Sequence, residues 1–406
     1  MKANASVDSR YASFRLGIAV LIMTLGASGM YVIPVVLPAV QAEFGVARAD
    51  ASLPYSLLMI GFGVGGLLMG RLADRFGVWV PLVIGACAIG AGYWVAGTTS
   101  SFVVFNAAHG LLLGLLGCSA TFSPLLADTS LWFVKRRGIA VAICASGNYL
   151  GGAIWPPLVQ RSVDAWGWRS TYIGIGIICA VSIAALALLM RPRPPLAAAG
   201  SVSSGGAAPE HPFDLSRAQA QVMLCIAGLA CCVAMSMPQV HIVAYCGDLG
   251  YGVARGAEML AVMLAFGIVS RLVSGVICDH IGGLRTLLLG SALQGVALLL
   301  FLPFDGLVSL YVIAALFGLF QGGIVPSYAI IVREHFPASQ AATRTGAIIM
   351  FTLLGMALGG WMSGKIFDLT GSYRAAFVNG IGWNLLNLPI AFFLLRRSFR
   401  REPLAA

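Results

Sequence analysis

The sequence predicts an all-α membrane protein with twelve transmembrane helices in two pseudo-symmetric six-helix bundles. Of its 406 residues, 59% are hydrophobic and only 10% are charged, whereas soluble domains carry about 25% charged residues. Apolar stretches of helix length recur along the whole chain, and motifs of the first half return in the second. A water-soluble fold of this length could not bury so much apolar surface, so the bilayer is an expected partner.

Twelve apolar stretches are long enough to cross a bilayer, which takes about 17 to 25 residues of helix. They cover 15–38, 53–73, 80–97, 102–127, 138–160, 170–190, 219–246, 256–278, 284–302, 307–332, 345–367 and 374–395. We expect Pro34 and Pro38 to break the first helix. The chain therefore divides into an N-terminal six-helix bundle (1–190), a linker rich in Pro, Ala, Gly and Ser (191–218) and a C-terminal six-helix bundle (219–406).

Basic residues between the spans predict the orientation, because positively charged loops stay on the cytoplasmic side. With the N-terminus inside, 18 of the 25 Lys and Arg residues are cytoplasmic, six lie outside and Arg271 lies within a span. Both termini and the linker are then cytoplasmic, and we expect a monomer in the cell inner (plasma) membrane. The net charge of +10 is spread between the spans and forms no aromatic-interleaved patch, so nucleic acid is not an expected partner.

Several chemistries find no support in the sequence. The nine cysteines all fall within apolar spans, so we interpret them as small buried hydrophobic residues. The sequence contains no phosphate-binding loop, metal-ligand cluster or nucleophile triad. An enzyme, an ATP-driven pump and a bound cofactor or metal are therefore not expected.

The two halves repeat each other at helix ends and at glycines. GRLADRFG after the second span corresponds to GVICDHIGG after the eighth, and glycines of the fifth span match glycines of the eleventh. The G-x-x-x-G pairs are expected to let helix backbones approach closely: Gly110 and Gly114, Gly147 and Gly151, Gly355 and Gly359. Parallel repeats of this kind place a substrate site between the halves, near the bilayer midplane.

GRLADRFG, echoed by GVICDHIGG, resembles the loop signature of the major facilitator superfamily. The resemblance implies the major facilitator fold and a secondary transporter, a symporter or antiporter, that works by alternating access. Asp74, Arg75 and Asp279 are expected to act in gating, because a carboxylate at a cytoplasmic helix end can pair with a basic group on a neighbouring helix. The alternative is ordinary helix termination and topology marking.

Three further stretches resemble the monocarboxylate and oxalate:formate antiporter group: WFVKRRGIA (132–140), PQVHIVAY (238–245) with DLG (248–250), and GIVSR (267–271). In that group the eighth-helix arginine contacts the substrate carboxylate, which implies this role for Arg271. Gly267 replaces the acidic residue of animal monocarboxylate carriers, and the first and eleventh spans lack a mid-membrane lysine. These departures argue against a proton-coupled lactate mechanism and against a two-cation oxalate site.

Arg271 is the candidate that the residues themselves favour most. It lies eight residues before Asp279, about 12 Å from the end of its helix and so near the midplane. A charge there costs at least about 2.5 kcal/mol and by default faces a functional cavity. The acidic residues lie in loops or at helix ends, so an anionic ligand, gripped by two parallel hydrogen bonds, suits this guanidinium. The alternative is an arginine satisfied by backbone carbonyls and water.

Other polar residues at similar depth are weaker candidates for substrate contact. His109 and His241 could bind an anion or carry a proton, which leaves proton coupling open, or they could be satisfied interior histidines. The remaining candidates either line the cavity or pack between helices: Tyr31, Asn148, Gln239, Tyr245, Gln321 and Tyr328.

Together these features predict a transporter of a small organic anion, a mono- or dicarboxylate. The main rival is an efflux pump for a drug or hydrophobic metabolite. Drug/proton antiporters commonly carry intramembrane acids, which disfavours that function here. A non-transporting sensor or scaffold would be expected to carry an extra soluble domain.

Overall fold

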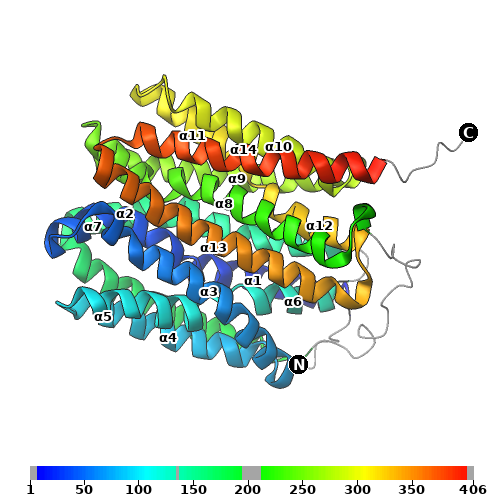
Figure 1. The fold of residues 1–406 in the computed structure, drawn as a ribbon. Coiled ribbons are helices and arrows are strands. Elements are labelled where there is room, and N and C mark those ends of the chain that lie inside the picture. Colours follow the sequence, from blue (N-terminus) through cyan, green and yellow to red (C-terminus); the bar gives the residue numbers. More distant parts are fainter. Residues whose placement is uncertain (1–6, 134–136, 194–211, 400–406) are drawn as a thin grey trace, which may run out of the picture. The chain divides into compact units, whose positions relative to one another are not determined.

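The computed structural model describes residues 7–133, 137–193 and 212–399 (Figure 1). Residues 134–136 of the WFVKRRGIA motif and most of the predicted linker, 194–211, lie outside the described residues. The described chain is helical, with no strand. Its helices are α1 (Arg10–Gly26), α2 (Ser28–Phe44), α3 (Arg48–Phe76), α4 (Trp79–Thr98), α5 (Phe102–Ala107), the π-helix η1 (Ala108–Cys118), α6 (Ser123–Trp132), α7 (Arg137–Leu189), the short 3-10 helix η3 (Pro212–Asp214), α8 (Arg217–Asp248), α9 (Val253–Ile281), α10 (Gly283–Leu300), α11 (Leu307–Gln321), α12 (Ile324–His335), α13 (Ala338–Thr370) and α14 (Tyr373–Phe399).

The described residues form two compact units. Unit 1 consists of Met1–Ser203 with Ile242–Ala265, and unit 2 consists of Ser204–His241 with Phe266–Ala406. In unit 1, α7 packs against α1 and α4, and η1 packs against α3. In unit 2, α10 packs against α11, α12 and α14.

The number of membrane spans agrees with the predicted twelve helices. Among the described residues, 11 helical segments are long and apolar enough to cross a bilayer, and one of them is the 52-residue segment Gly138–Leu189. That segment joins two helices across a kink at Gly167, whose φ of 75° lies in the left-handed region that glycine tolerates. It supplies both the fifth and the sixth predicted spans, so the predicted fold class is confirmed.

The first span is broken, but not where the prolines predict. Pro34 and Pro38 lie inside the continuous helix α2, and the irregularity falls at the single residue Ala27, which keeps helical angles between α1 and α2. The prediction of a break at the prolines was therefore wrong. In a membrane protein, neighbouring helices can satisfy the backbone groups that a proline leaves unpaired, so a helix can continue through it.

The fourth span is broken as well, in direct contact with the break in the first. The π-helix η1 ends at Cys118 and α6 begins at Ser123. A side chain on Gly26 would collide with the side chain of Thr121, so the two breaks touch. Both interruptions therefore lie at one place in unit 1, and π-helical segments are frequent at functional sites.

Glycines at equivalent positions confirm the internal repeat. Gly77 follows α3 with a φ of 87°, and Gly282 follows α9 with a φ of 81°. Residues with a side chain rarely adopt such angles, so the repeated loop motif requires glycine at both positions.

The G-x-x-x-G pairs bring helix backbones into contact, as predicted. An added Cβ at Gly147 would lie 2.8 Å from the carbonyl oxygen of Val20, and one at Gly151 would lie 2.6 Å from that of Thr24. These two glycines therefore let α7 lie directly on α1.

Two further glycine pairs act in the same way. In unit 2, side chains at Gly355 and Gly359 would collide with the backbone of α8, at Leu229 and Val233. In unit 1, an added Cβ at Gly114 would lie 2.5 Å from the carbonyl oxygen of Leu58, and one at Gly110 would lie 3.3 Å from the Cβ of Leu57. The predicted packing role of these glycines is confirmed.

A buried ion pair ties three helices of unit 1 together. Arg15 Nε donates to Asp128 Oδ2 at 2.9 Å, and Arg15 Nη2 donates to Asp128 Oδ1 at 3.0 Å and to the carbonyl oxygen of Met190 at 3.0 Å. The guanidinium carbon also lies 4.9 Å from the ring centroid of Trp132. The sequence places Asp128 just beyond a span, whereas the structure buries it inside α6 with 7% exposure.

Candidate functional site

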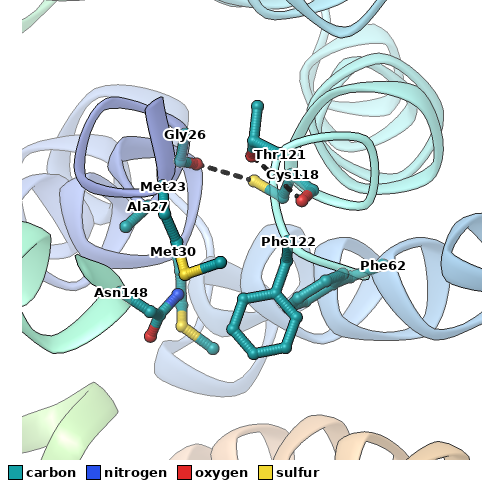
Figure 2. Close-up of a pocket in the computed structure, with 9 residues that line it drawn as sticks. All are labelled: Met23, Gly26, Ala27, Met30, Phe62, Cys118, Thr121, Phe122 and Asn148. Atoms are coloured by element: carbon teal, nitrogen blue, oxygen red, sulfur yellow. Dashed lines mark hydrogen bonds between the residues drawn. The ribbon is translucent and has the colours of Figure 1, made fainter. Parts of the chain in front are cut away.

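A pocket opens where the first and fourth spans are both broken (Figure 2). Its volume is about 10 Å³, room for about one water molecule. Residues from four parts of unit 1 line it: Met23, Gly26, Ala27 and Met30 from the first span, Phe62 from α3, Cys118, Thr121 and Phe122 from the fourth span, and Asn148 from α7. The two helix breaks thus create the space between otherwise closely packed helices.

Most of the pocket surface is apolar. Met23 and Met30 lie on one side, and the rings of Phe62 and Phe122 meet edge to face on the other, with centroids 5.5 Å apart and an interplanar angle of 90° (Figure 2). None of the nine lining residues is charged. The lining of this small pocket is therefore largely apolar and uncharged.

Two of the polar groups in the pocket are used by the chain itself. Cys118 Sγ donates to the carbonyl oxygen of Gly26 at 3.3 Å, and Thr121 Oγ1 donates to that of Cys118 at 3.1 Å (Figure 2). Carbonyls at the end of a helix lack their regular partners. These two bonds satisfy such groups and stabilise the breaks.

Tyr31 and Asn148 are brought together by the structure. The buried Tyr31 hydroxyl donates to Asn148 Oδ1 at 3.0 Å. Because that bond occupies the carboxamide oxygen, Asn148 presents its amide nitrogen as a hydrogen-bond donor at the pocket. Asn148 is only half-buried, so this donor is accessible.

His109 lies in the π-helix and is fully enclosed by unit 1. Its Nδ1 lies 2.8 Å from the carbonyl oxygen of Phe105, and its Nε2 lies 3.3 Å from the hydroxyl of Tyr172. The carbonyl can only accept, so Nδ1 carries the proton and Nε2 accepts from the tyrosine. Both ring nitrogens are thus engaged within the unit.

His241 of unit 2 has a similar environment on α8. Its Nε2 lies 2.7 Å from the carbonyl oxygen of Gly360, and its Nδ1 lies 3.1 Å from the hydroxyl of Tyr373. Here Nε2 carries the proton and Nδ1 accepts. Each predicted histidine is therefore held by one backbone carbonyl and one tyrosine, which the sequence did not reveal because both tyrosines come from distant helices.

Arg271 lies on α9 in unit 2 and is half-buried. The neighbouring Gly267 and Ser270 face the junction between α11 and α12, because a Cβ on Gly322 would collide with the Gly267 carbonyl and would lie 2.8 Å from the Cβ of Ser270. This tight junction fixes the helix that carries the guanidinium.

The other predicted polar residues are buried. Gln239, Gln321 and Tyr328 belong to unit 2, and Tyr245 lies on the part of α8 that belongs to unit 1. The Tyr328 hydroxyl donates to Cys231 Sγ at 3.7 Å. This bond directs Tyr328 toward α8 within unit 2.

The predicted gating residues Asp74, Arg75 and Asp279 are exposed at the ends of α3 and α9. Within the described ranges, none of the three belongs to an ion pair. The Arg75 guanidinium carbon lies 5.2 Å from the ring centroid of Phe76.

An ion pair that the sequence did not predict lies at the opposite end of α3. Arg48 Nη1 donates to Asp248 Oδ2 at 3.1 Å, and Arg48 Nη2 donates to Oδ1 at 3.3 Å. The sequence places both residues at helix ends on the same side of the membrane, but it cannot show that these two ends meet.

Among the described residues, the membrane-spanning helices and their internal repeat define a polytopic membrane protein. The profile of the Major Facilitator Superfamily matches residues 18–309 and 259–406, so the chain belongs to this superfamily. It is accordingly a transporter and not an enzyme.

Relatives and solved structures agree with this assignment. The chain is 29% identical over 339 residues to Monocarboxylate transporter 13 of Rattus norvegicus, covering 81% of this chain and 75% of that protein. It is 21% identical over 332 residues to the agnestins efflux protein AgnL12 of Paecilomyces divaricatus, covering 81% and 74%. The crystal structure of the nucleoside transporter NupG shares the fold, with a TM-score of 0.73, 14% identity and coverage of 95% and 99%. The first relative agrees with the resemblance carried by the sequence motifs.

Proposed function

We propose that this protein is a secondary active transporter that moves a small organic anion, a mono- or dicarboxylate, across the cell inner (plasma) membrane. Arg271 carries this proposal, because it places a permanent positive charge in the middle of the membrane-spanning helix α9. Its side chain is half-buried. The similarity to a protein named as a monocarboxylate transporter supports the same substrate class.

The chemistry of the guanidinium favours a carboxylate over a neutral solute. Its planar donors match the two oxygens of a carboxylate in a paired geometry. A charge at this depth is costly, and an anionic ligand offsets part of that cost while it is bound. Such a site discriminates strongly between an acid and the corresponding amide.

The remaining parts of the mechanism follow from the same assignment. Tyr31 and Asn148, which are hydrogen-bonded to each other in unit 1, stay candidates for substrate contact. Coupling to protons stays open, with His109 and His241 as the candidates. Both termini are assigned to the cytoplasm by the distribution of basic residues, and the protein acts as a monomer.

The exposed ends of α3 and α9 are proposed to control the conformational cycle. Replacing Asp74 by asparagine is expected to slow turnover several-fold while ligand affinity stays within a few-fold, because this side chain biases conformations without touching substrate. Uptake rates and binding constants measured on the same preparation check this. Asp50→Asn, an exposed acid at the other end of α3, is the matched control. Lost binding with normal turnover would contradict the gating role.

Efflux of a hydrophobic compound is the second candidate function. The similarity to the agnestins efflux protein favours it. A transporter of this kind would bind neutral compounds as well as acids.

Thermal stabilisation of the purified protein separates the two candidates. A ligand at 100 times its dissociation constant stabilises the folded state by about 2.7 kcal/mol. A panel of carboxylic acids, each tested beside its amide, is expected to raise the melting temperature only with the acids. Stabilisation by amides and other neutral compounds alone would favour the efflux function.

A further inference from the structure

We infer that a cluster of arginines at one end of unit 1 binds the headgroup of an anionic phospholipid such as phosphatidylglycerol. Arg71 and Arg75 come from the last two turns of α3, and Arg191 and Arg193 follow the end of α7. All four residues are exposed. The inference concerns the lipid around the protein, so it does not depend on which solute is transported.

The cluster gathers at the loop between α3 and α4. The guanidinium carbon of Arg191 lies 4.8 Å from the ring centroid of Trp79, the first residue of α4. A Cβ on Gly77 would lie 3.9 Å from Arg193 Nε and 3.6 Å from Trp79 Cδ1. Arg75 precedes this glycine by two residues. The ends of α3 and α7, which are far apart in the sequence, therefore present their arginines beside one loop.

The positive charge of this cluster is not balanced within the described part of the chain. None of the four arginines belongs to an ion pair there. Asp74 is the one acid in the last two turns of α3, and it is exposed as well. The cluster thus offers several guanidinium groups to an anion from outside the chain, and guanidinium groups match phosphate oxygens in a paired geometry.

The equivalent loop of unit 2 carries an anion of its own. Gly282 corresponds to Gly77, and the next residue, Gly283, donates its backbone N–H to the carboxylate oxygens of Glu334 at 3.1 and 3.2 Å. In unit 1 no carboxylate accepts from this loop among the described residues, and Arg193 lies beside it instead. The repeated loop therefore has an internal anion in unit 2, and we expect a ligand to supply the anion in unit 1.

The surroundings favour a lipid over a free ion. The cluster lies at the ends of helices long and apolar enough to span a membrane, on the side that the basic residues assign to the cytoplasm. Trp79 is half-buried, and tryptophan is enriched where membrane and water meet. Leu188 and Leu189, at the end of α7, are exposed and can contact acyl chains. Basic groups between such helices on the cytoplasmic side bind anionic headgroups.

Native mass spectrometry of the full-length purified protein, titrated with dioleoyl phosphatidylglycerol, tests this inference. Each basic residue near an anionic lipid surface contributes about fivefold in affinity. Arg191→Gln with Arg193→Gln is therefore expected to weaken binding of the first phosphatidylglycerol at least about tenfold. Arg191→Lys with Arg193→Lys keeps both charges and should stay within about threefold of the wild type. A melting curve of each sample checks the fold, and the single variant Arg193→Gln, with an expected loss of about fivefold, replaces a double variant that does not fold.

The matched control is Arg333→Gln with Arg396→Gln. Both residues are exposed in the last turns of helices of unit 2, α12 and α14, on the same predicted side of the membrane, so this pair removes the same charge. It should change the affinity less than about twofold.

Three outcomes would overturn the site. Equal weakening by the two glutamine pairs would reduce the effect to general surface charge. Dioleoyl phosphatidylcholine bound as tightly as phosphatidylglycerol would show that the headgroup charge is not recognised. Displacement of the lipid by an equal concentration of inorganic phosphate would assign the cluster to a free ion.

Discussion

Replacing Arg271 by alanine is expected to weaken binding of the transported carboxylate by at least about 30-fold, since losing one partner of a hydrogen-bonded charge pair costs about 2 to 5 kcal/mol. The protein should still fold, because the side chain is only half-buried in α9 and the close contact with the α11–α12 junction is made by Gly267 and Ser270. Calorimetric titration of the purified variant, with a melting curve of the same sample, measures both effects.

Two further variants make this result specific. Arg271→Lys should recover little binding, because a compact ammonium cannot reproduce the planar two-donor grip of a guanidinium. Arg255→Ala removes an arginine that is exposed in α9 and pairs with Glu258 three residues later, and it should bind carboxylate like the wild type. Wild-type affinity in a well-folded Arg271→Ala protein would refute the site. Equal loss of stability and activity in the alanine and lysine variants would instead assign Arg271 to helix bracing.

Replacing Asp128 by alanine is expected to be the most destabilising single change among those considered. It leaves the guanidinium of Arg15, a residue that is 2% exposed, without its carboxylate partner. Breaking a buried pair in this way costs about 3 to 5 kcal/mol. Thermal denaturation of the detergent-purified protein should therefore show a clearly lowered melting temperature.

A double substitution distinguishes the charge effect from the loss of packing. Arg15→Met with Asp128→Leu removes both charges and keeps much of the volume, and it is expected to restore most of the lost stability. Asp305→Ala, at an exposed position, should change stability by less than about 0.5 kcal/mol. If the double variant is as unstable as Asp128→Ala, the ion pair is not the reason for the destabilisation.

The sequence predicts the membrane spans and the repeat well because both depend on local properties. Apolar length alone marks a span, and glycine alone tolerates the positive φ of Gly77 and Gly282. The spacing of small residues likewise predicts that helix backbones approach closely at Gly147 and Gly151. These features need no knowledge of which helices are neighbours.

The pocket and the buried ion pair depend on contacts between distant segments, and the sequence does not specify these. The first helix breaks at Ala27, where it meets the break in the fourth span at Thr121, while the more conspicuous Pro34 and Pro38 continue the helix. In the sequence Asp128 lies just past a predicted span. Only the structure shows that it pairs with Arg15, 113 positions earlier. For the same reason the methionine and phenylalanine lining could not be told from ordinary core residues.

The most direct measurement of the central claim is uptake by wild-type protein in proteoliposomes, with a radiolabelled monocarboxylate compared with its amide. The account predicts saturable uptake of the acid, competition by other carboxylates and no uptake of the amide above protein-free vesicles. Transport of the amide or of a cationic compound, with no response to any carboxylate, would contradict it.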